Sequence, residues 1–421
     1  MSDKSHVLIV GAGMTGLLLA QKLKSHGISF TIFERDLSAE HRGAGWGLLI
    51  HWAPDVFLGL LPQNLREQIP SANVDPEAHS QGKIGRFPFF DVVSGKKRFE
   101  NVSDKRIRLN RKRLRKILLS GLDVQWNKTL LEITQDLDES ITVHFTDGSQ
   151  AHGTHLAGCD GSRSRTREVL CSKVGTSPLN SRLDARLLGG SVIYTSEMGR
   201  RLQERDTFFF AGGDQGASSF FFFAVQDTPN HNERTNRDTY AGQTIITWPY
   251  RSGFLGRDDP IEVPTSQEER LRLMKEIAKS WTSPFRDAVY AIPEDTHIQA
   301  VNLESWTPVA DGWDNLNGRA VLIGDAAHTM TMFRGEAFNH GIIDVEKYTS
   351  THLPVLEGKE DISASLGACA AYESEMIGRT QGAVAASNQA CMDAHSLNGE
   401  RITEKSPAVS RGLGATVVNS G

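Results

Sequence analysis

The chain has 421 residues, of which 39% are hydrophobic and 23% are charged, and its formal net charge is −5. This length exceeds one simple core, so two packed domains of a soluble globular enzyme are expected. The weak negative charge argues against nucleic acid and anionic membranes as partners, and no apolar run approaches the ~20 residues of a membrane span. The four cysteines show no C-x-x-C spacing, which argues against disulfides and zinc and favours a cytoplasmic location.

The chain starts with a strand–helix–strand pattern. His6–Val10 is an apolar strand, a helix is expected from about Thr15 to His26, and Ser29–Phe33 is a second strand. Gly27 follows the helix, where a left-handed cap is common. The pattern predicts a βαβ unit.

The turn between the first strand and the helix carries the sequence G-A-G-M-T-G. Gly11 permits a tight turn, Gly13 lets a pyrophosphate approach the backbone, and Gly16 allows the helix to pack closely on the strand. The helix N-terminus attracts phosphates, and Glu34, which Arg35 follows, can accept hydrogen bonds from both hydroxyls of an adenosine ribose. The turn therefore predicts a dinucleotide site, without separating NAD from FAD.

The rest of the chain divides into a mixed region, an aromatic β region and a helical end. A basic amphipathic helix is expected between Arg108 and Ser120, because leucine and isoleucine recur there at helical spacing. In the middle third, aromatic strands are separated by Gly, Asp and Asn turns. The further elements expected are the strand Ile141–Phe145, the strands Phe208–Phe210, Phe220–Val225 and Thr244–Trp248, the strand and glycine turn Ala320–Asp325, and helices to about residue 395.

Two later turns combine glycine with aspartate. After a buried strand, the Asp325 carboxylate of the pair Gly324-Asp325 can hold a hydroxyl of a ribityl chain, although such a pair alone usually marks only a turn. The pair Asp160-Gly161 precedes three arginines at alternate positions. Those arginines are typical of a solvated basic loop, and the alternative that they assist phosphate docking stays open.

Together these segments resemble the group A flavoprotein monooxygenases, the para-hydroxybenzoate hydroxylase type, and more loosely their fungal secondary-metabolite members. Gly11–Gly16 matches the dinucleotide fingerprint, Asp160-Gly161 the D-G motif and Gly324-Asp325 the G-D motif, in the family's order. The resemblance covers residues 6 to about 390. It implies an α/β fold, in which a Rossmann-like FAD-binding domain is interleaved with a β-sheet substrate domain and followed by a C-terminal helical segment.

The resemblance also implies a set of residues that hold FAD. Arg111 begins an R-x-x-L helix whose arginine contacts the cofactor, and Arg42 with Gly45 and Gly47 resembles the segment that runs beside the flavin. The implied set is Gly11, Gly13, Gly16, Glu34, Arg35, Arg42, Gly45, Gly47, Arg111, Asp160, Gly324, Asp325, Gly335, Ala337, Phe338 and Asn339.

The loop after the G-D motif departs from the family pattern. Met332 stands where proline is usual, Ala337 replaces the second glycine, and Phe338 precedes Asn339. In the family this loop lies against the oxygen-reacting face of the flavin. An oxidase or dehydrogenase on the same fold therefore remains an alternative to a monooxygenase, as does a non-catalytic ligand-binding descendant.

Aromatic strands set residues 181–295 apart as the candidate substrate domain. Residues 1–180 and 296–397 are expected to form the FAD-binding domain with its late helices, with residues 80–105 as candidates for the substrate domain, and residues 398–421 are expected to form a loose tail. Half of the aromatic side chains at strand spacing are expected to be core, and the others to form a roof over a small apolar or aromatic substrate.

The chemistry implied by the resemblance starts with NADPH, which docks transiently and reduces FAD. O2 then forms a flavin C4a-hydroperoxide, which inserts one oxygen atom into a small electron-rich substrate, in a reaction of secondary metabolism. No residue is assigned a catalytic role, because His51, His328 and His340 lack a carboxylate-paired motif, and no metal site is expected. The residues do not distinguish NADPH from NADH, and they carry no signal for an oligomeric state.

Overall fold

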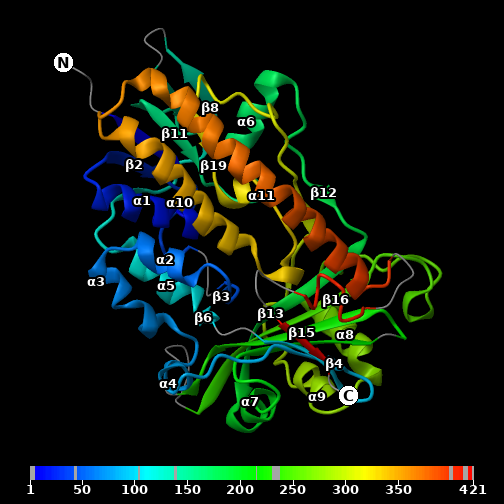
Figure 1. Ribbon diagram of the computed structural model, residues 1–421. Helices are drawn as coiled ribbons and strands as arrows, with labels where there is room; N and C mark the ends of the chain where they lie inside the picture. Colours follow the sequence, from blue (N-terminus) through cyan, green and yellow to red (C-terminus); the bar gives the residue numbers. More distant parts are fainter. Residues whose placement is uncertain are drawn as a thin grey trace.

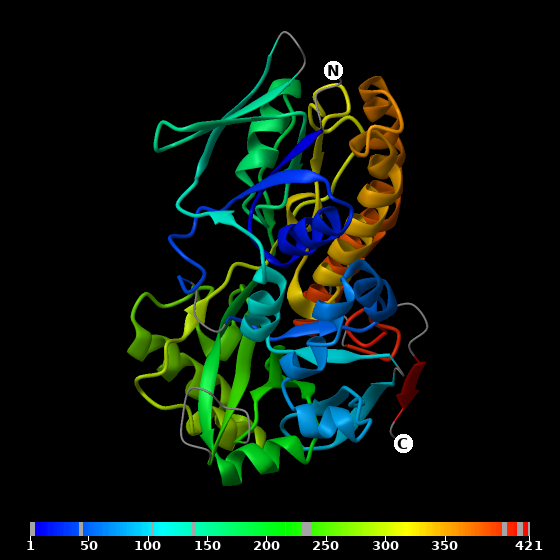
Figure 2. The ribbon, with the colours of Figure 1, turned by 90° about the vertical axis from the view of Figure 1, so that its left-hand side faces the viewer.

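The chain folds into two stacked halves in a computed structural model (Figures 1 and 2). In Figure 1 the upper half holds the first strands, coloured blue, and the lower half holds a larger sheet, coloured mainly green. The residues described are 5–41, 45–102, 105–136, 140–214, 216–229, 238–397, 402–410 and 416–419.

The upper half is built on a five-stranded parallel sheet with the order β19-β11-β1-β2-β7. The prediction of a parallel βαβ unit is confirmed, because β1 and β2 have the predicted bounds. Near-continuous apolar strands suit a parallel sheet that is covered on both faces. The strands are β1 (His6–Val10), β2 (Ser29–Phe33), β7 (Val124–Gln125), β11 (His155–Gly158) and β19 (Ala320–Leu322).

Helices cover one face of this sheet, and a small antiparallel sheet with one helix covers the other (Figure 2). On the first face α1 packs against α10, and α10 packs against α11. The covering elements are α1 (Met14–Ser25), α10 (Ala337–Leu356) and α11 (Ser365–Ala394) on one side, and β8 (Leu130–Gln135), β9 (Ile141–Phe145), β10 (Gln150–Gly153) and α6 (Arg165–Val174) on the other.

The predicted helix at residues 108–120 is wrong over its first residues. Ile107–Leu109 instead forms β6, which pairs antiparallel with β3 (Leu48–Ile50). Helix α5 (Arg111–Leu119) begins only after Asn110, whose side-chain oxygen accepts hydrogen bonds from the first-turn N–H groups of Lys112 and Arg113 at 3.1 and 3.2 Å. Asparagine is one of the preferred residues at a helix N-cap. The cap at Asn110 therefore decides where the helix begins, although the spacing of the apolar residues suggested an earlier start.

The lower half is built on an eight-stranded sheet with the order β17-β13-β16-β15-β14-β4-β5-β20. Its strands come from three separate parts of the chain, and β4 and β5 bring residues 88–102 into it. They are β4 (Pro88–Asp91), β5 (Lys97–Val102), β13 (Ala185–Thr195), β14 (Phe209–Asp214), β15 (Ser219–Asp227), β16 (Thr239–Pro249), β17 (Gln299–Ala300) and β20 (Thr416–Asn419).

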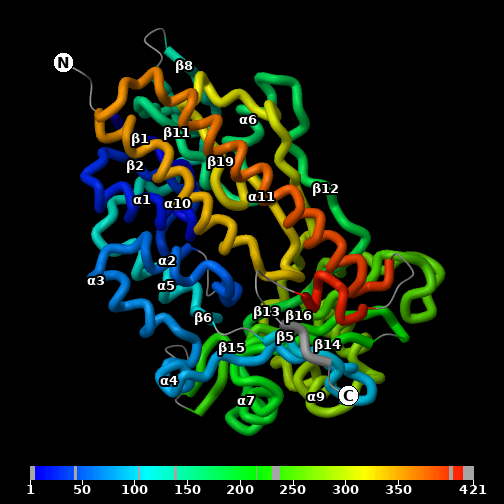
Figure 3. Tube along the Cα trace, viewed as in Figure 1, coloured from blue at the N-terminus to red at the C-terminus, as the bar shows by residue number. Residues whose placement is uncertain are grey.

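Helix α11 joins the two halves. Its 30 residues would extend about 45 Å, and Figure 3 shows it running from the upper half to the lower. Cys369, Tyr372 and Met376 belong to the core of the upper half, whereas Ala390 and Cys391 belong to the core of the lower half. One rigid element therefore fixes how the two halves meet.

The chain after α11 differs from the expected loose tail in the part that the structure describes. Ile402, Ala408 and Val409 are buried in the core of the lower half, and β20 pairs antiparallel with β5. Arg334 Nη1 donates hydrogen bonds to two carbonyl groups of this segment at 2.9 Å. The sequence pattern is weak here because backbone pairing, rather than a periodic apolar face, holds the segment.

The remaining elements are short or pack on the two sheets. Among the described residues no helix combines the length and apolarity needed to cross a bilayer. The remaining elements are α2 (Pro54–Leu60), α3 (Gln63–Arg66), α4 (Pro76–Ser80), α7 (Ser196–Gln203), α8 (Gln267–Ile277), α9 (Phe285–Tyr290), β12 (Ser181–Arg182) and β18 (Glu304–Ser305).

Candidate functional site

The glycine turn between β1 and α1 is shaped by close backbone contacts. Gly11 has φ +108°, and a Cβ there would lie 2.4 Å from the carbonyl oxygen of Cys159 on the neighbouring chain segment. A Cβ at Gly16 would lie 2.1 Å from the carbonyl oxygen of Gly11. Gly13 is the N-cap of α1, and a Cβ there would touch nothing closer than 4.0 Å, so an anion can approach the first turn of the helix.

Replacing Gly11 by alanine is expected to lower the free energy of unfolding by about 3 kcal/mol or more, because the new Cβ meets backbone that cannot move. Thermal unfolding of the two proteins measures the change. Gly27→Ala is the matched control, since Gly27 also has a positive φ (+69°) but nothing within 4 Å of its Cβ position. A loss no greater for Gly11→Ala than for the control would contradict the argument.

Glu34 lies at the end of β2 with its carboxylate fixed on both oxygens. Oε2 accepts a hydrogen bond from the N–H of Ala12 at 2.8 Å, and Oε1 accepts one from the N–H of Asp36 at 3.1 Å. Each carboxylate oxygen accepts two hydrogen bonds in full, so one lone pair on each remains for a ligand hydroxyl. Glu34 is 7% exposed, while Arg35 is exposed at the same edge.

A cavity of about 280 Å³ extends along this edge of the parallel sheet. It begins at Glu34 and ends at Asp160 and Asp325, with the glycine turn between them. Of the predicted site residues, its lining contains Gly11, Gly13, Glu34, Arg35, Arg111, Asp160 and Asp325.

A second cavity, of about 340 Å³, lies between the two halves. Ser162 and Asp325 line both cavities, so the two meet at this point. Of the predicted site residues, the larger cavity is lined by Gly47, Asp325, Gly335, Ala337 and Phe338.

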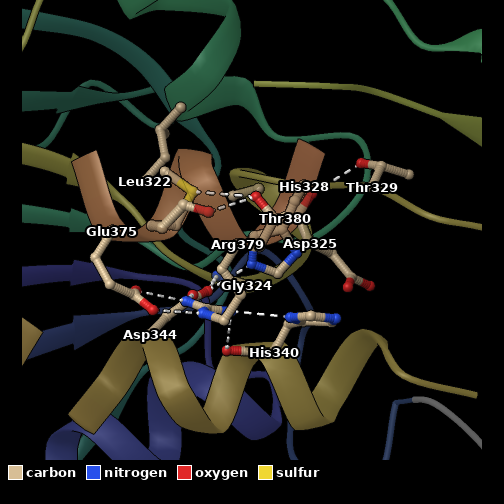
Figure 4. Close-up of polar contacts among 12 residues, drawn as sticks. Leu322, Gly324, Asp325, His328, Thr329, His340, Asp344, Glu375, Arg379 and Thr380 are labelled. Carbon is tan, nitrogen blue, oxygen red and sulfur yellow. Dashed lines mark hydrogen bonds and ion pairs between the residues drawn. The ribbon is translucent and has the colours of Figure 1, made fainter. Parts of the chain in front are cut away.

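Asp325 stands where the cavities meet, in the 3₁₀ turn Gly324–Ala326 after β19. Burial raises the pKa of its carboxyl group, although His328, Arg111 and Arg167 act in the opposite direction. Figure 4 shows its carboxylate directed away from the neighbouring ion pairs. The side chain is therefore a half-buried acid in a cavity wall, suited to a ligand hydroxyl.

Under this turn lies a buried ion-pair cluster centred on Asp344 of α10 (Figure 4). Its Oδ2 accepts hydrogen bonds from the backbone N–H of Gly324 at 2.7 Å and from His328 Nε2 at 2.6 Å. Its Oδ1 accepts one from Arg379 Nη2 of α11 at 2.7 Å, and Arg379 also pairs with Glu375. The cluster fixes the G-D turn to both long helices.

The Asp344 cluster (Asp344, His328 and Arg379) is absent from the sequence prediction. The signal that could have found it is modest: an acid in an otherwise apolar stretch, five residues after Asn339. Burial raises the pKa of Asp344, but the charges of His328 and Arg379 outweigh that effect and hold it well below its ordinary value. Since His328 Nε2 is bonded within this cluster, its place is structural.

The segment 45–52 is attached to the start of α10 by Asn339. Asn339 Oδ1 accepts a hydrogen bond from the N–H of His51 at 2.9 Å, and its Nδ2 donates to the carbonyl of Leu49 at 3.0 Å. Asn339 lines neither cavity, and its position indicates that it orients the cavity wall. Gly45 has φ +65° and lies beside Arg111, whereas Arg42 falls outside the described residues.

The aspartate of the D-G motif forms hydrogen bonds within the protein, so part of its role is structural. Asp160 accepts hydrogen bonds from the Ser164 hydroxyl at 2.5 Å and the Thr166 N–H at 2.9 Å, and burial raises the pKa of its carboxyl group. Of the three following arginines, Arg165 borders the smaller cavity. Arg167 is buried and donates to backbone carbonyls in both Asp-containing turns.

The aromatic strands divide between cavity and core. Phe209, Phe220 and Phe222 line the larger cavity, together with Met332 from the departing loop. Trp248 is fully buried, and its indole N–H donates to the carbonyl of Ile261 at 3.0 Å. The apolar part of the wall would exclude water from a flat ligand.

The polar groups along the two connected cavities follow one another in the order of the parts of a flavin dinucleotide. Glu34 suits the ribose, the open turn at Gly13 suits the pyrophosphate, and the half-buried acid Asp325 suits the ribityl hydroxyls. The apolar larger cavity beyond Asp325 has room for a ring system and a second small molecule. Within the described chain no cluster of acidic, histidine or cysteine side chains could hold a metal ion.

Comparisons with known proteins place the chain in a family. A family model described as "NAD(P)-binding Rossmann-like domain" matches residues 9–41. The chain is 45% identical over 417 residues to a "Probable FAD-dependent monooxygenase" of Arthroderma benhamiae, covering 97% of this chain and 96% of the relative. It is 37% identical to the "FAD-dependent monooxygenase dbaB" of Emericella nidulans, covering 80% of this chain and 84% of the relative.

Solved structures share the fold at lower identity. The 2,6-dihydroxypyridine-3-hydroxylase of Arthrobacter nicotinovorans has a TM-score of 0.71 at 18% identity and covers 97% of both chains. Klebsiella pneumoniae HpxO complexed with FAD and uric acid has a TM-score of 0.70 at 18% identity, covering 94% of this chain and 90% of that one. The prediction of an α/β fold with a Rossmann-like domain is thereby confirmed. With relatives of 45% and 37% identity along most of its length, the chain belongs to the FAD-dependent monooxygenases.

Proposed function

We propose that this protein uses NADPH and O2 to transfer one oxygen atom to a small, electron-rich and largely apolar organic substrate. The observation that carries the proposal is the meeting of a polar cleft beside the glycine turn and a largely apolar cavity at Asp325 and Ser162. When bound, FAD supplies the transfer of two electrons from NADPH to O2, so that the substrate gains one oxygen atom and the other leaves as water.

The polar residues of the smaller cavity bind and orient the cofactor in this proposal. Glu34 accepts the ribose hydroxyls, the first turn of α1 receives the pyrophosphate, and Asp325 accepts a hydroxyl of the ribityl chain. Arg111, which lines the same cavity, supplies a positive charge near the phosphates. The roles of Arg35, Asp160 and Arg165 are to border the cleft and balance its charge.

The walls of the larger cavity exclude water and hold the substrate. Phe209, Phe220 and Phe222 offer flat apolar contacts, and Ala337 and Phe338 at the start of α10 form the opposite part of the lining. A dry cavity favours transfer of oxygen to the substrate over release of hydrogen peroxide. A place for this reaction in secondary metabolism is part of the proposal.

An absorption spectrum of the purified protein, followed by anaerobic NADPH and then air, tests the proposal. We expect flavin bands that bleach with NADPH faster than with NADH and return in air, with oxygenated product when a substrate is present. Hydrogen peroxide in place of product, with every electron-rich substrate tried, would favour an oxidase, for which Met332 in the cavity wall is the structural argument. A colourless protein that cannot be reconstituted with FAD would contradict the proposal.

A further inference from the structure

Arg108 is a buried cation in the wall of the larger cavity. It lies on β6 and is 5% exposed, and its guanidinium carbon is 5.7 Å from the centroid of the Phe209 ring. Nη2 donates one hydrogen bond, to Gln243 Oε1 at 3.2 Å, and Nε has no acceptor. Within the described part of the chain, no carboxylate forms an ion pair with it. Its charge is thus left without a counter-charge from the protein.

Of the three acids in the lining of this cavity, Glu336 and Glu304 are occupied elsewhere, and the third, Asp325, is assigned to a hydroxyl of the cofactor in the proposed function. Glu336 pairs with Arg334 at 2.7 Å, and Glu304 accepts a hydrogen bond from Asn302 at 2.7 Å. Burial lowers the pKa of Arg108 to about 10, and no negative charge counteracts that effect. The side chain therefore remains protonated at neutral pH. A buried charge without a partner is unfavourable, so an anionic ligand would gain from binding here.

Arg106 offers a comparison within the same segment. It lies as far from the Phe209 ring, at 5.7 Å, and is also buried, at 7% exposure. Its Nη2, however, donates to both the backbone carbonyl and the side-chain oxygen of Asn101, at 2.9 and 2.6 Å, and Arg106 does not line the cavity. Arg106 thus stabilises the fold, whereas Arg108 faces the cavity.

We propose that Arg108 determines substrate specificity by binding an oxyanion of the substrate, a carboxylate, phenolate or enolate, whose aromatic frame lies against Phe209, Phe220 and Phe222. The guanidinium fork presents several N–H donors in one plane, which suits such a group. This inference rests on the proposed function, because it names the substrate class of the same cavity. The inference also orients the substrate in the cavity, because the anionic end would lie at β6, where Arg108 is located.

Calorimetric titration of the purified holoprotein with pairs of matched probes tests the inference. One pair is 1-naphthoate and 1-naphthamide, and the other is pentafluorophenolate and pentafluoroaniline, so the two arms separate a carboxylate from a phenolate. We expect the wild-type protein to bind the anion of at least one pair about tenfold or more tightly than its neutral partner. Arg108→Met should abolish that preference and leave the affinity for the neutral probe within about twofold.

Two further variants serve as controls. Arg108→Lys should keep part of the preference for the anionic probe. Arg106→Met should lower the stability of the protein and leave that preference unchanged. A wild-type protein with no preference for either anion, or an Arg108→Met protein that keeps one, would overturn the inference. So would loss of flavin from Arg108→Met, which would assign the residue to FAD. Calorimetry does not depend on NADPH oxidation, so a failure here is distinct from a failure of the proposed monooxygenation.

Discussion

Replacing Asp325 by alanine is expected to give a folded protein that retains less than a tenth of the wild-type flavin. The carboxylate lines both cavities, and no other acid is shared between them. The same change should raise the stability of the flavin-free protein at neutral pH. Burial raises the pKa of Asp325, so the folded chain resists ionising it, and removing the group removes that penalty.

The sign of this effect depends on pH. At a pH below the unfolded-state pKa, ~3.9, the acid is protonated in both states and the variant gains nothing. As the pH rises through the raised folded-state pKa, the penalty in the wild-type apoprotein grows to its full value. The flavin-to-protein absorbance ratio and the melting temperature of the apoproteins, at pH 4 and pH 8, measure the two effects.

Two variants separate the role of Asp325 from general damage. Asp325→Asn should keep part of the flavin, since an amide oxygen still accepts a hydrogen bond. Asp214→Ala removes another buried carboxylate, one that accepts hydrogen bonds from two backbone N–H groups and from Ser280 and that lies outside both cavities. It should show the opposite result, lower stability with flavin retained. An Asp325→Ala protein with a full complement of flavin would refute the assignment.

Replacing Asp344 by asparagine is expected to lower the free energy of unfolding by about 3–5 kcal/mol, because it removes the fully buried carboxylate that binds both His328 and Arg379 and leaves Arg379 with only the partly exposed Glu375. The folded-state pKa of Asp344 is depressed, so its contribution is full above the unfolded-state value, ~3.9, decreases as the pH falls below that value and is lost only as the pH falls through the folded-state value. Urea unfolding at pH 7 and at pH 3.5 should therefore show a large difference between the proteins at pH 7 and a smaller one at pH 3.5.

The partners of Arg379 provide the control for this prediction. Glu375 binds the same guanidinium, but its side chain is 34% exposed, so Glu375→Gln should cost at most about 1 kcal/mol. Replacing Arg379 by methionine in the Asp344→Asn background should restore part of the lost stability, since the cation that has lost its buried partner is then gone. Equal losses for Asp344→Asn and Glu375→Gln would show that the cluster is not an energetic centre.

The features that local sequence carries were predictable, and those that depend on distant contacts were not. The βαβ unit and its glycine turn are encoded within a short stretch, so β1, β2 and Glu34 lie where expected. The start of α5 was misplaced because one capping side chain, Asn110, decides it. The pairing of β20 with β5, the Arg379–Asp344 ion pair and the unpaired state of Arg108 each depend on residues far apart in sequence, which no local pattern records.

The place of β19 in the parallel sheet has a consequence for the order of events during synthesis. Gly11 is synthesised long before the strand that brings Asp325 into the same sheet edge, Ala320–Leu322. Until then the nascent chain has only half of the proposed cofactor cleft, and contacts between such distant segments are slow to form. The proposed cofactor cleft is therefore complete only after the chain has been made through Asp325, and an N-terminal fragment that ends before Ala320 is expected to lack the ribityl end of that cleft.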